Sequence, residues 1–177
     1  MNLVDKKQLI AYCQKAKKPG FRPKKVIMHW TAGNYTNVFN DYHACIKGDG
    51  ELYFTTDNMA EVLEHTWRRN TGNIGLALCC AAGAVFPDKF PKGFEPTVAQ
   101  IETLAETMAI LAKEFNLSIT KDVFMTHTEI AIIDGYGPYS GDSETKWDLF
   151  LLKDSDGYYK PGGEVLRGKA NWYLKNS

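Results

Sequence analysis

The feature that most constrains the fold is an uninterrupted apolar run from Ile74 to Ala82, with the sequence I-G-L-A-L-C-C-A-A. A strand with one face in water alternates apolar and polar residues, whereas a strand buried on both faces is apolar throughout. Lys25 to Trp30 is a second, shorter run that suits a buried strand. The sequence therefore predicts central strands that are covered on both sides.

Other strands and helices alternate with these runs along the chain. Two β-prone runs, 42–47 and 51–56, flank the turn residues Gly48-Asp49-Gly50 and predict a hairpin. The clearest helix is predicted from Thr97 to about Phe115 and opens with a capping box. Three further elements and one loop are predicted: helices at 4–17 and 161–174, a strand at 123–125, and a long loop at 132–145. This interleaving predicts an α/β single domain with a central mixed β-sheet flanked by helices.

Charge and composition exclude several classes of function. The 177 residues contain 21 Lys and Arg against 21 Asp and Glu, so no net field attracts nucleic acid or anionic lipid. There is no apolar run of about 18 residues, so no membrane insertion is expected. The first residues lack the apolar core of a secretory signal, which predicts a chain made in the cytoplasm. The lysines near the amino terminus are interpreted as a solvated helix face rather than as a contact for an anionic polymer.

Cysteine usage points to a reduced chain. Two of the four cysteines are adjacent, none forms a C-x-x-C pair, and all lie in apolar surroundings: Cys13, Cys45, Cys79 and Cys80. Buried thiols fit this pattern better than a disulfide framework or a cysteine zinc site.

Three separate segments contain residues that could carry chemistry. His29 and His127 each follow a short apolar run, and Asp148 closes the triplet Lys146-Trp147-Asp148. Two imidazoles and a carboxylate form a chemically sensible zinc set, because three protein ligands leave the fourth position open for water. Their spacing matches no compact metal motif. Taken singly, each histidine is more often structural than a ligand, and for Asp148 the cap of a turn is slightly favoured over a site residue.

Five stretches then carry a resemblance, in order and with consistent spacing. They are V-I-M-H-W-T-A-G (26–33), Y-H-A-C-I-K-G-D-G-E-L-Y (42–53), E-H-T (64–66) with N-T-G-N-I-G-L-A-L (70–78), H-T-E-I-A (127–131) and K-W-D-L (146–149). Through them the chain resembles the zinc-dependent N-acetylmuramoyl-L-alanine amidases, a family that includes peptidoglycan recognition proteins and amidase-type phage lysozymes. The closing G-G-E-V-L-R-G-K-A-N-W-Y also looks like the tail of prophage-encoded members.

The resemblance implies a role for each matching position. It implies that His29, His127 and Asp148 hold Zn²⁺. It implies a catalytic lysine, a tyrosine beside the metal water, and a carboxylate two residues past the second histidine ligand, at Lys146, Tyr42 and Glu129. From the same likeness, together with the aromatic residues that could stack on sugar rings, the substrate is expected to meet His65, Trp30, Trp67 and Asn70, with Tyr136 and Tyr139 as further stacking candidates.

The chain also departs from the family pattern. Some members have a glutamate base in the strand that here reads I-G-L-A-L, where this chain has Ala77, so proton handling is left to Tyr42. Asp148 stands where phage lysozymes and animal members often have cysteine. The loop 132–145 is longer than in the phage enzymes. The resemblance divides the chain into a basic amino-terminal helix and linker (1–24), an amidase core (25–152) and a carboxy-terminal extension packed on the same domain (153–177).

The function implied by the resemblance is hydrolysis of the amide between N-acetylmuramic acid and L-alanine in peptidoglycan. A phage or prophage endolysin released to the cell wall by a holin, and acting as a monomer, is the leading interpretation. A non-catalytic peptidoglycan-binding module and a cytosolic amidase that recycles muropeptides are the alternatives. An interaction protein is a third, with the basic amino-terminal helix as its only candidate surface.

Overall fold

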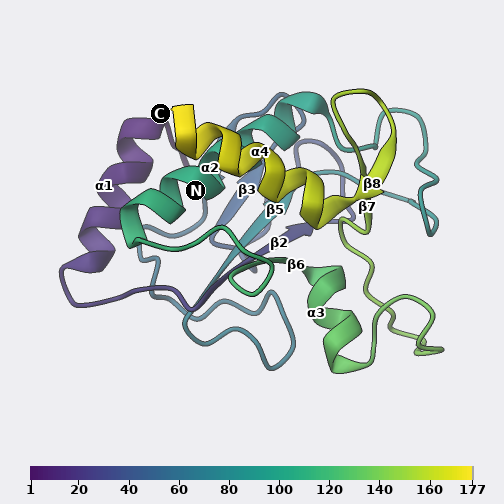
Figure 1. The fold of residues 1–177 in the computed structure, drawn as a ribbon, viewed down its shortest axis with the longest axis horizontal. Coiled ribbons are helices and arrows are strands. Elements are labelled where there is room, and N and C mark those ends of the chain that lie inside the picture. Colours follow the sequence, from purple (N-terminus) through teal and green to yellow (C-terminus); the bar gives the residue numbers. More distant parts are fainter. Residues whose placement is uncertain (177) are drawn as a thin grey trace.

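Six strands form the central sheet of the computed structural model, which describes residues 1–176 (Figure 1). Their order across the sheet is β1 (Asn2–Leu3), β4 (Leu52–Phe54), β3 (Ala44–Ile46), β5 (Asn73–Leu78), β2 (Lys25–Trp30) and β6 (Phe124–Thr126). The pairs β3–β5, β5–β2 and β2–β6 are parallel, whereas β4 pairs antiparallel with β3 and β1. The predicted mixed sheet in an α/β domain is therefore confirmed.

Side-chain alternation gives the two faces of the sheet different surroundings. Helices α2 (Val98–Phe115) and α4 (Gly162–Asn176) lie across one face, and α1 (Lys6–Lys17) packs beside α2 (Figure 1). Val26, Met28 and Trp30 of β2 join the large apolar core on this side. Because successive side chains point to opposite faces, Ile27 and His29 face the other side, where Ile27 packs with Met125 and Ile130. The two faces thus separate the main core from the side that bears His29.

Helix α2 is anchored to the sheet at its first turn. The predicted capping box is present: the Thr97 hydroxyl accepts from the Gln100 N–H, and the Gln100 side chain accepts from the Thr97 N–H. The Gln100 amide also donates to the carbonyl oxygens of Ile46 and Cys79, both at 2.9 Å. Gln100 is fully buried, so all its hydrogen bonds are made inside the protein. This side chain fixes α2 against the ends of β3 and β5.

Several elements differ from the sequence expectations. A helix, α3 (His127–Asp134), occupies the start of the segment predicted as a loop, because Thr126 and Glu129 form a second capping box. The loop therefore begins at Gly135, which ends α3 in a left-handed conformation. A small separate hairpin, β7 (Leu151–Lys153) and β8 (Tyr159–Pro161), precedes α4. The predicted strands at 25–30 and 123–125, the 42–56 hairpin and the 97–115 helix agree with the structure to within a few residues.

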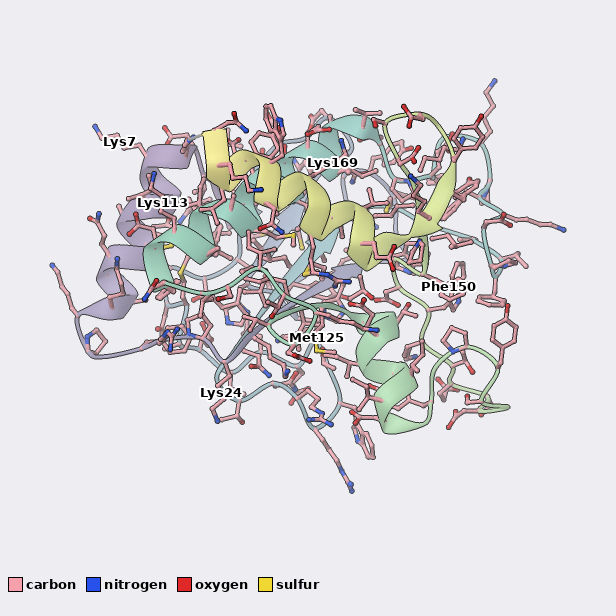
Figure 2. The ribbon with its side chains drawn as sticks, in the orientation of Figure 1. Lys7, Lys24, Lys113, Met125, Phe150 and Lys169 are labelled. Carbon is pink, nitrogen blue, oxygen red and sulfur yellow. The ribbon has the colours of Figure 1, made fainter. Side chains whose placement is uncertain are left out.

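The lysines of α1 are largely neutralised by nearby acids. Lys6 contacts Glu106 at 3.1 Å and Lys17 contacts Glu114 at 2.8 Å, both on α2. Figure 2 shows the side chain of Lys7 extending away from the body of the protein. This arrangement supports the interpretation of α1 as a solvated helix face. All four cysteines are buried and free, which confirms the expected reduced thiols. Over residues 1–176, no helix is long and apolar enough to cross a membrane.

The anchor formed by Gln100 predicts a specific loss of stability. Gln100→Ala removes the amide donor of the buried Cys79 carbonyl and one of the two donors of the Ile46 carbonyl, which we expect to lower the free energy of unfolding by about 2–3 kcal/mol. Thr103→Ala removes one peripheral hydrogen bond, to the Gly50 carbonyl, and should cost only about 1 kcal/mol. Urea unfolding followed by circular dichroism measures both losses. Equal losses in the two variants would show that Gln100 is not an anchor.

Candidate metal centre

Two parallel strands deliver the histidines to the same edge of the sheet. His29 is the second-last residue of β2, and His127 directly follows β6, which pairs with β2 through Met28 and Thr126. The cap at Thr126 fixes the direction in which α3 starts, and His127 is its first residue. In open α/β sheets, ligands bind at the carboxyl ends of parallel strands. The register of β2 and β6 therefore brings both imidazoles to the edge where a ligand site is expected.

Asp148 reaches the same place from the segment that follows α3. The Thr128 hydroxyl on α3 donates to the Asp148 carbonyl at 2.7 Å, which ties this segment to the helix. Leu149 then adopts a left-handed conformation with φ of 59° and is completely buried. This turn sends Leu149 into the core while Asp148 faces the two histidines.

The three side chains form a cluster that can hold a metal ion. One ligand atom from each of His29, His127 and Asp148 lies within 4.8 Å of the others. Oδ2 of Asp148 is 3.3 Å from Nδ1 of both histidines. That is long for a charge-assisted hydrogen bond, which is usually about 2.7–2.9 Å. Two ligands at about 2.0–2.1 Å from a tetrahedral Zn²⁺ would be about 3.3–3.4 Å apart, so the spacing fits a shared ion.

Burial and mutual contact determine the protonation of the cluster. Burial lowers the pKa of His29 to about 4, although the hydrogen bond with Asp148 acts in the opposite direction. Burial by itself raises the pKa of Asp148, but hydrogen bonds with His127 and His29 outweigh it and hold the pKa below its usual value. The metal-free cluster therefore combines a neutral His29 imidazole with an ionised carboxylate at neutral pH. These are the protonation states that a divalent cation needs.

A cavity of about 420 Å³ opens above this cluster. His127 and Asp148 lie in its wall together with Lys146 and Tyr42. The Tyr42 ring lies 5.1 Å from the His29 ring, and burial followed by the charge of Asp148 raises the pKa of its phenol. The remaining lining residues are Trp30, Thr31, Ala32, His65, Ala81, Gly83, Ala84, Thr145 and Trp147. The structure thus brings His127, Asp148, Lys146 and Tyr42 to one opening, with His29 buried directly behind them.

The aromatic residues predicted to meet substrate have different positions. Trp30 lines the cavity but is buried, with its ring 4.7 Å from that of Trp147. Trp67 is 62% exposed and lies outside the cavity lining, with its ring 6.3 Å from Tyr136. Tyr136 lies in turn 6.1 Å from His127. Trp67 therefore belongs to a row of neighbouring aromatic rings that runs from His127 to the surface of the protein.

Asn70 and Glu129, which were predicted to be functional residues, make contacts with residues that neighbour the clustered side chains. The Asn70 carboxamide accepts from the Thr66 N–H at 2.7 Å and lies outside the cavity lining. Glu129 accepts from the Thr126 N–H and forms a two-pronged ion pair with Arg167, at 2.8 and 2.9 Å. A Cβ at Gly163 would lie 2.6 Å from the Glu129 carboxylate, so only glycine leaves room for this pair. In residues 1–176, no hydrogen bond joins Glu129 to either clustered histidine.

The sequence analysis missed several residues around the cluster. Thr66 lies 3.3 Å from Nε2 of His29, and Thr128 holds Asp148. Gly75 leaves the space in which the His65 ring lies. A glycine inside an apolar strand signals a close approach of another group, so this position could have been identified from the sequence.

The fold and the site together define an α/β protein with a cluster that can hold a metal ion at the foot of an open cavity, an arrangement used by metal-dependent hydrolases. The profile of the family described as N-acetylmuramoyl-L-alanine amidase matches residues 19–147. The chain belongs to this family. The activity of the chain is the hydrolysis of the amide that joins N-acetylmuramic acid to L-alanine in peptidoglycan. Among curated proteins, no sequence matches the chain significantly.

Solved structures that match the chain include a phage endolysin and two bacterial amidases. An endolysin of a Thermus scotoductus bacteriophage is 18% identical, with a TM-score of 0.48, and the match covers 62% of this chain and 74% of that one. Two N-acetylmuramoyl-L-alanine amidases of Clostridium intestinale are each 20% identical with TM-scores of 0.45, over 62% of this chain and 72% or 73% of theirs.

The lowered histidine pKa values predict that the metal-free protein is acid-labile. Burial lowers the pKa of His29 and His65 below the unfolded value near 6.5, so the unfolded chain binds more protons between about pH 4 and 6.5. We expect the free energy of unfolding to fall as pH decreases from 6.5 towards 4. Urea unfolding of chelator-treated protein at pH 7, 6 and 5 measures this slope. His65→Asn should make it shallower, and a flat profile for the wild type would contradict the assignment.

Proposed function

We propose that the chain is a zinc-dependent amidase that cleaves peptidoglycan between the lactyl group of N-acetylmuramic acid and the stem peptide. The observation that carries this proposal is the pair of 3.3 Å distances from one Asp148 oxygen to the two Nδ1 atoms. The donor set of two imidazoles and a carboxylate fits Zn²⁺ and leaves one position for water. Zinc held by His29, His127 and Asp148 would polarise the amide carbonyl and lower the pKa of water to about 7.

Lys146 is placed to stabilise charge that develops during hydrolysis. It lines the same cavity as Asp148, two residues along the chain, and its side chain is 44% exposed. Among residues 1–176, its only ion pair is with Glu144 at 3.7 Å, on a side chain that is 84% exposed, so no buried acid of this part of the chain immobilises its ammonium group. An ammonium group there can donate to the oxygen of the amide carbonyl as it gains negative charge.

Tyr42 acts as a donor rather than as a phenolate. Burial and the neighbouring Asp148 raise the pKa of its phenol, so the hydroxyl keeps its proton at neutral pH. Its ring lies over the same cavity, 5.1 Å from the ring of His29. We therefore assign Tyr42 to holding a water molecule or the leaving nitrogen through its O–H. Glu129 is assigned to the support of His127 through the helix cap.

The zinc proposal predicts loss of activity when metal is removed. Incubation with a chelator should abolish the release of stem peptides from purified peptidoglycan, and added Zn²⁺ should restore it. His127→Ala should lose both bound zinc and activity, as measured by mass spectrometry and by amine release. Activity that survives both treatments would remove the metal from the mechanism. Wall binding with zinc bound but no released peptide would favour a recognition module.

The role of Lys146 predicts a selective loss of turnover. Lys146→Met should lower kcat by about 10²–10³-fold, because one oxyanion donor is removed. Zinc content and thermal stability should remain unchanged, since the ion pair of Lys146 is with the exposed Glu144 and the cluster of possible ligands consists of other residues. A loss of zinc in this variant would assign Lys146 to the metal site instead. Lys153→Met, which removes a lysine outside the cavity lining, is the matched control.

We also propose that the physiological substrate is the intact cell wall, as for a phage or prophage endolysin. The resemblance of the core and of the tail to phage and prophage amidases supports this proposal. Rates on intact sacculi and on soluble muropeptides distinguish a lysin from an amidase that recycles wall fragments. A strong preference for soluble fragments would favour recycling. Release by a holin and a monomeric state belong to the same proposal and are tested by co-expression and by sedimentation.

A further inference from the structure

We propose that His65 and Thr66 are positioning residues for the metal ligand His29, and that Gly75 provides the space for His65. This inference rests on the proposed zinc site. It gives His65 a different role from the substrate contact that the resemblance implied. Two observations support it: a set of polar contacts behind His29, and a packing arrangement that holds His65 in place. A chemical argument about which nitrogen of His29 carries the proton connects these contacts to metal binding.

The contacts lie on the side of His29 that points away from Asp148. Nδ1 of His29 faces Asp148, whereas its Nε2 lies 3.2 Å from Nδ1 of His65 and 3.3 Å from the Thr66 hydroxyl. The Thr66 hydroxyl is itself 2.9 Å from Nδ1 of His65. All three side chains are buried, so water does not compete for these contacts. The three atoms form a triangle behind the ligand.

The protons can be distributed over this triangle without conflict when a cation occupies Nδ1 of His29. A neutral imidazole that coordinates through Nδ1 carries its proton on Nε2. That N–H can donate to Thr66 or to Nδ1 of His65, and the Thr66 hydroxyl can donate to Nδ1 of His65. Such an acceptor behind a ligand histidine fixes its tautomer and orientation and raises its basicity. The triangle therefore favours the form of His29 that binds metal.

The position of His65 depends on the absence of a side chain at Gly75. A Cβ built on Gly75 would lie 2.5–2.8 Å from three atoms of the His65 ring, all of which belong to the rigid imidazole. Gly75 is in the middle of β5, next to Ile27 of β2, so it lies one layer below His29 on the same face. His65 thus rests directly on the backbone of the sheet.

His43 holds this arrangement from behind. Its Nδ1 accepts from the Gly75 N–H at 3.0 Å and its Nε2 donates to the Glu61 carbonyl at 3.0 Å, so both nitrogens are used. Its ring lies 5.9 Å from that of His65. Nε2 of His65 is buried and has no hydrogen-bond partner in the described part of the chain. The polar contacts of the His65 ring therefore run through Nδ1 to His29 and Thr66, while the ring also forms part of the cavity wall.

Metal affinity is the measurement that isolates this role. The metal-free protein is titrated with Zn²⁺ against a chromophoric chelator, and with Co²⁺ while its visible absorption spectrum is recorded. We expect His65→Leu and the isosteric Thr66→Val each to weaken binding by about 10–100-fold and to change the Co²⁺ spectrum. His65→Asn, which keeps an acceptor near the position of Nδ1, and Thr66→Ser should recover most of the affinity.

Matched controls separate positioning from folding. Thr103→Val also removes one threonine hydrogen bond, but it lies on α2 far from the cluster and should leave metal affinity unchanged. Gly75→Ala should weaken binding in the wild-type chain and add nothing in a His65→Ala chain, because the ring that it displaces is already gone. Circular dichroism and urea unfolding verify that each variant is folded.

The outcomes distinguish this inference from the proposal on which it rests. A folded Thr66→Val or His65→Leu variant that binds Zn²⁺ as tightly as the wild type overturns the positioning role and leaves the zinc site standing. A wild-type protein that binds no Zn²⁺ overturns the zinc site and the positioning role together. An equal loss of metal affinity in His65→Leu and His65→Asn would also contradict the positioning role of His65, because the hydrogen-bond acceptor at this position would then have no effect on binding.

Discussion

The alternation of side chains along β2 is the constraint on which the core and the site both depend. Met28 and Trp30 point into the apolar core under α2 and α4, so His29 between them must point to the opposite face. A shift of register by one residue would exchange these faces and place an imidazole in the core. The hydrogen-bonded register of β2 with β5 and β6 therefore sets the metal cluster and the core together.

Much of the fold follows from local signals in the sequence. The capping box at Thr97 and the apolar stripe behind it defined α2, and the uninterrupted apolar runs defined β2 and β5. The helix that begins at His127 was missed, although Thr126 and Glu129 have the same capping spacing as Thr97 and Gln100. A helix of eight residues offers too few turns for a clear apolar period, and tertiary contacts such as the Glu129–Arg167 pair stabilise it.

The candidate site was less accessible to such reasoning. Periodicity cannot tell which face of a strand buried on both sides lies next to a cavity. The strand sequence therefore did not show whether the side chain of His29 points into the core or into a site. Family resemblance gave the ligand set, and the structure places those three residues together. The family resemblance could not distinguish a residue that contacts the substrate from one that supports a metal ligand. Asn70 and Glu129 were grouped with the substrate and the catalytic residues, yet Asn70 accepts from the Thr66 backbone and Glu129 from the Thr126 backbone and from Arg167.

Small residues on the face of the sheet that bears His29 leave room for the side chains of the site. Ala77 lies beside both His29 and Cys45 in the register of the sheet, and with Cys45 and Cys79 it forms the apolar surface on which Tyr42 packs. A longer side chain at position 77 would compete with the Tyr42 ring for this space, just as a Cβ at Gly75 would displace His65. The ionised Asp148 is mostly buried beside a neutral His29 imidazole, and removing a charge from water is costly without a partner of opposite sign. A divalent cation at Oδ2 would provide that partner, so the contacts that shape the site would also couple metal binding to the stability of the fold.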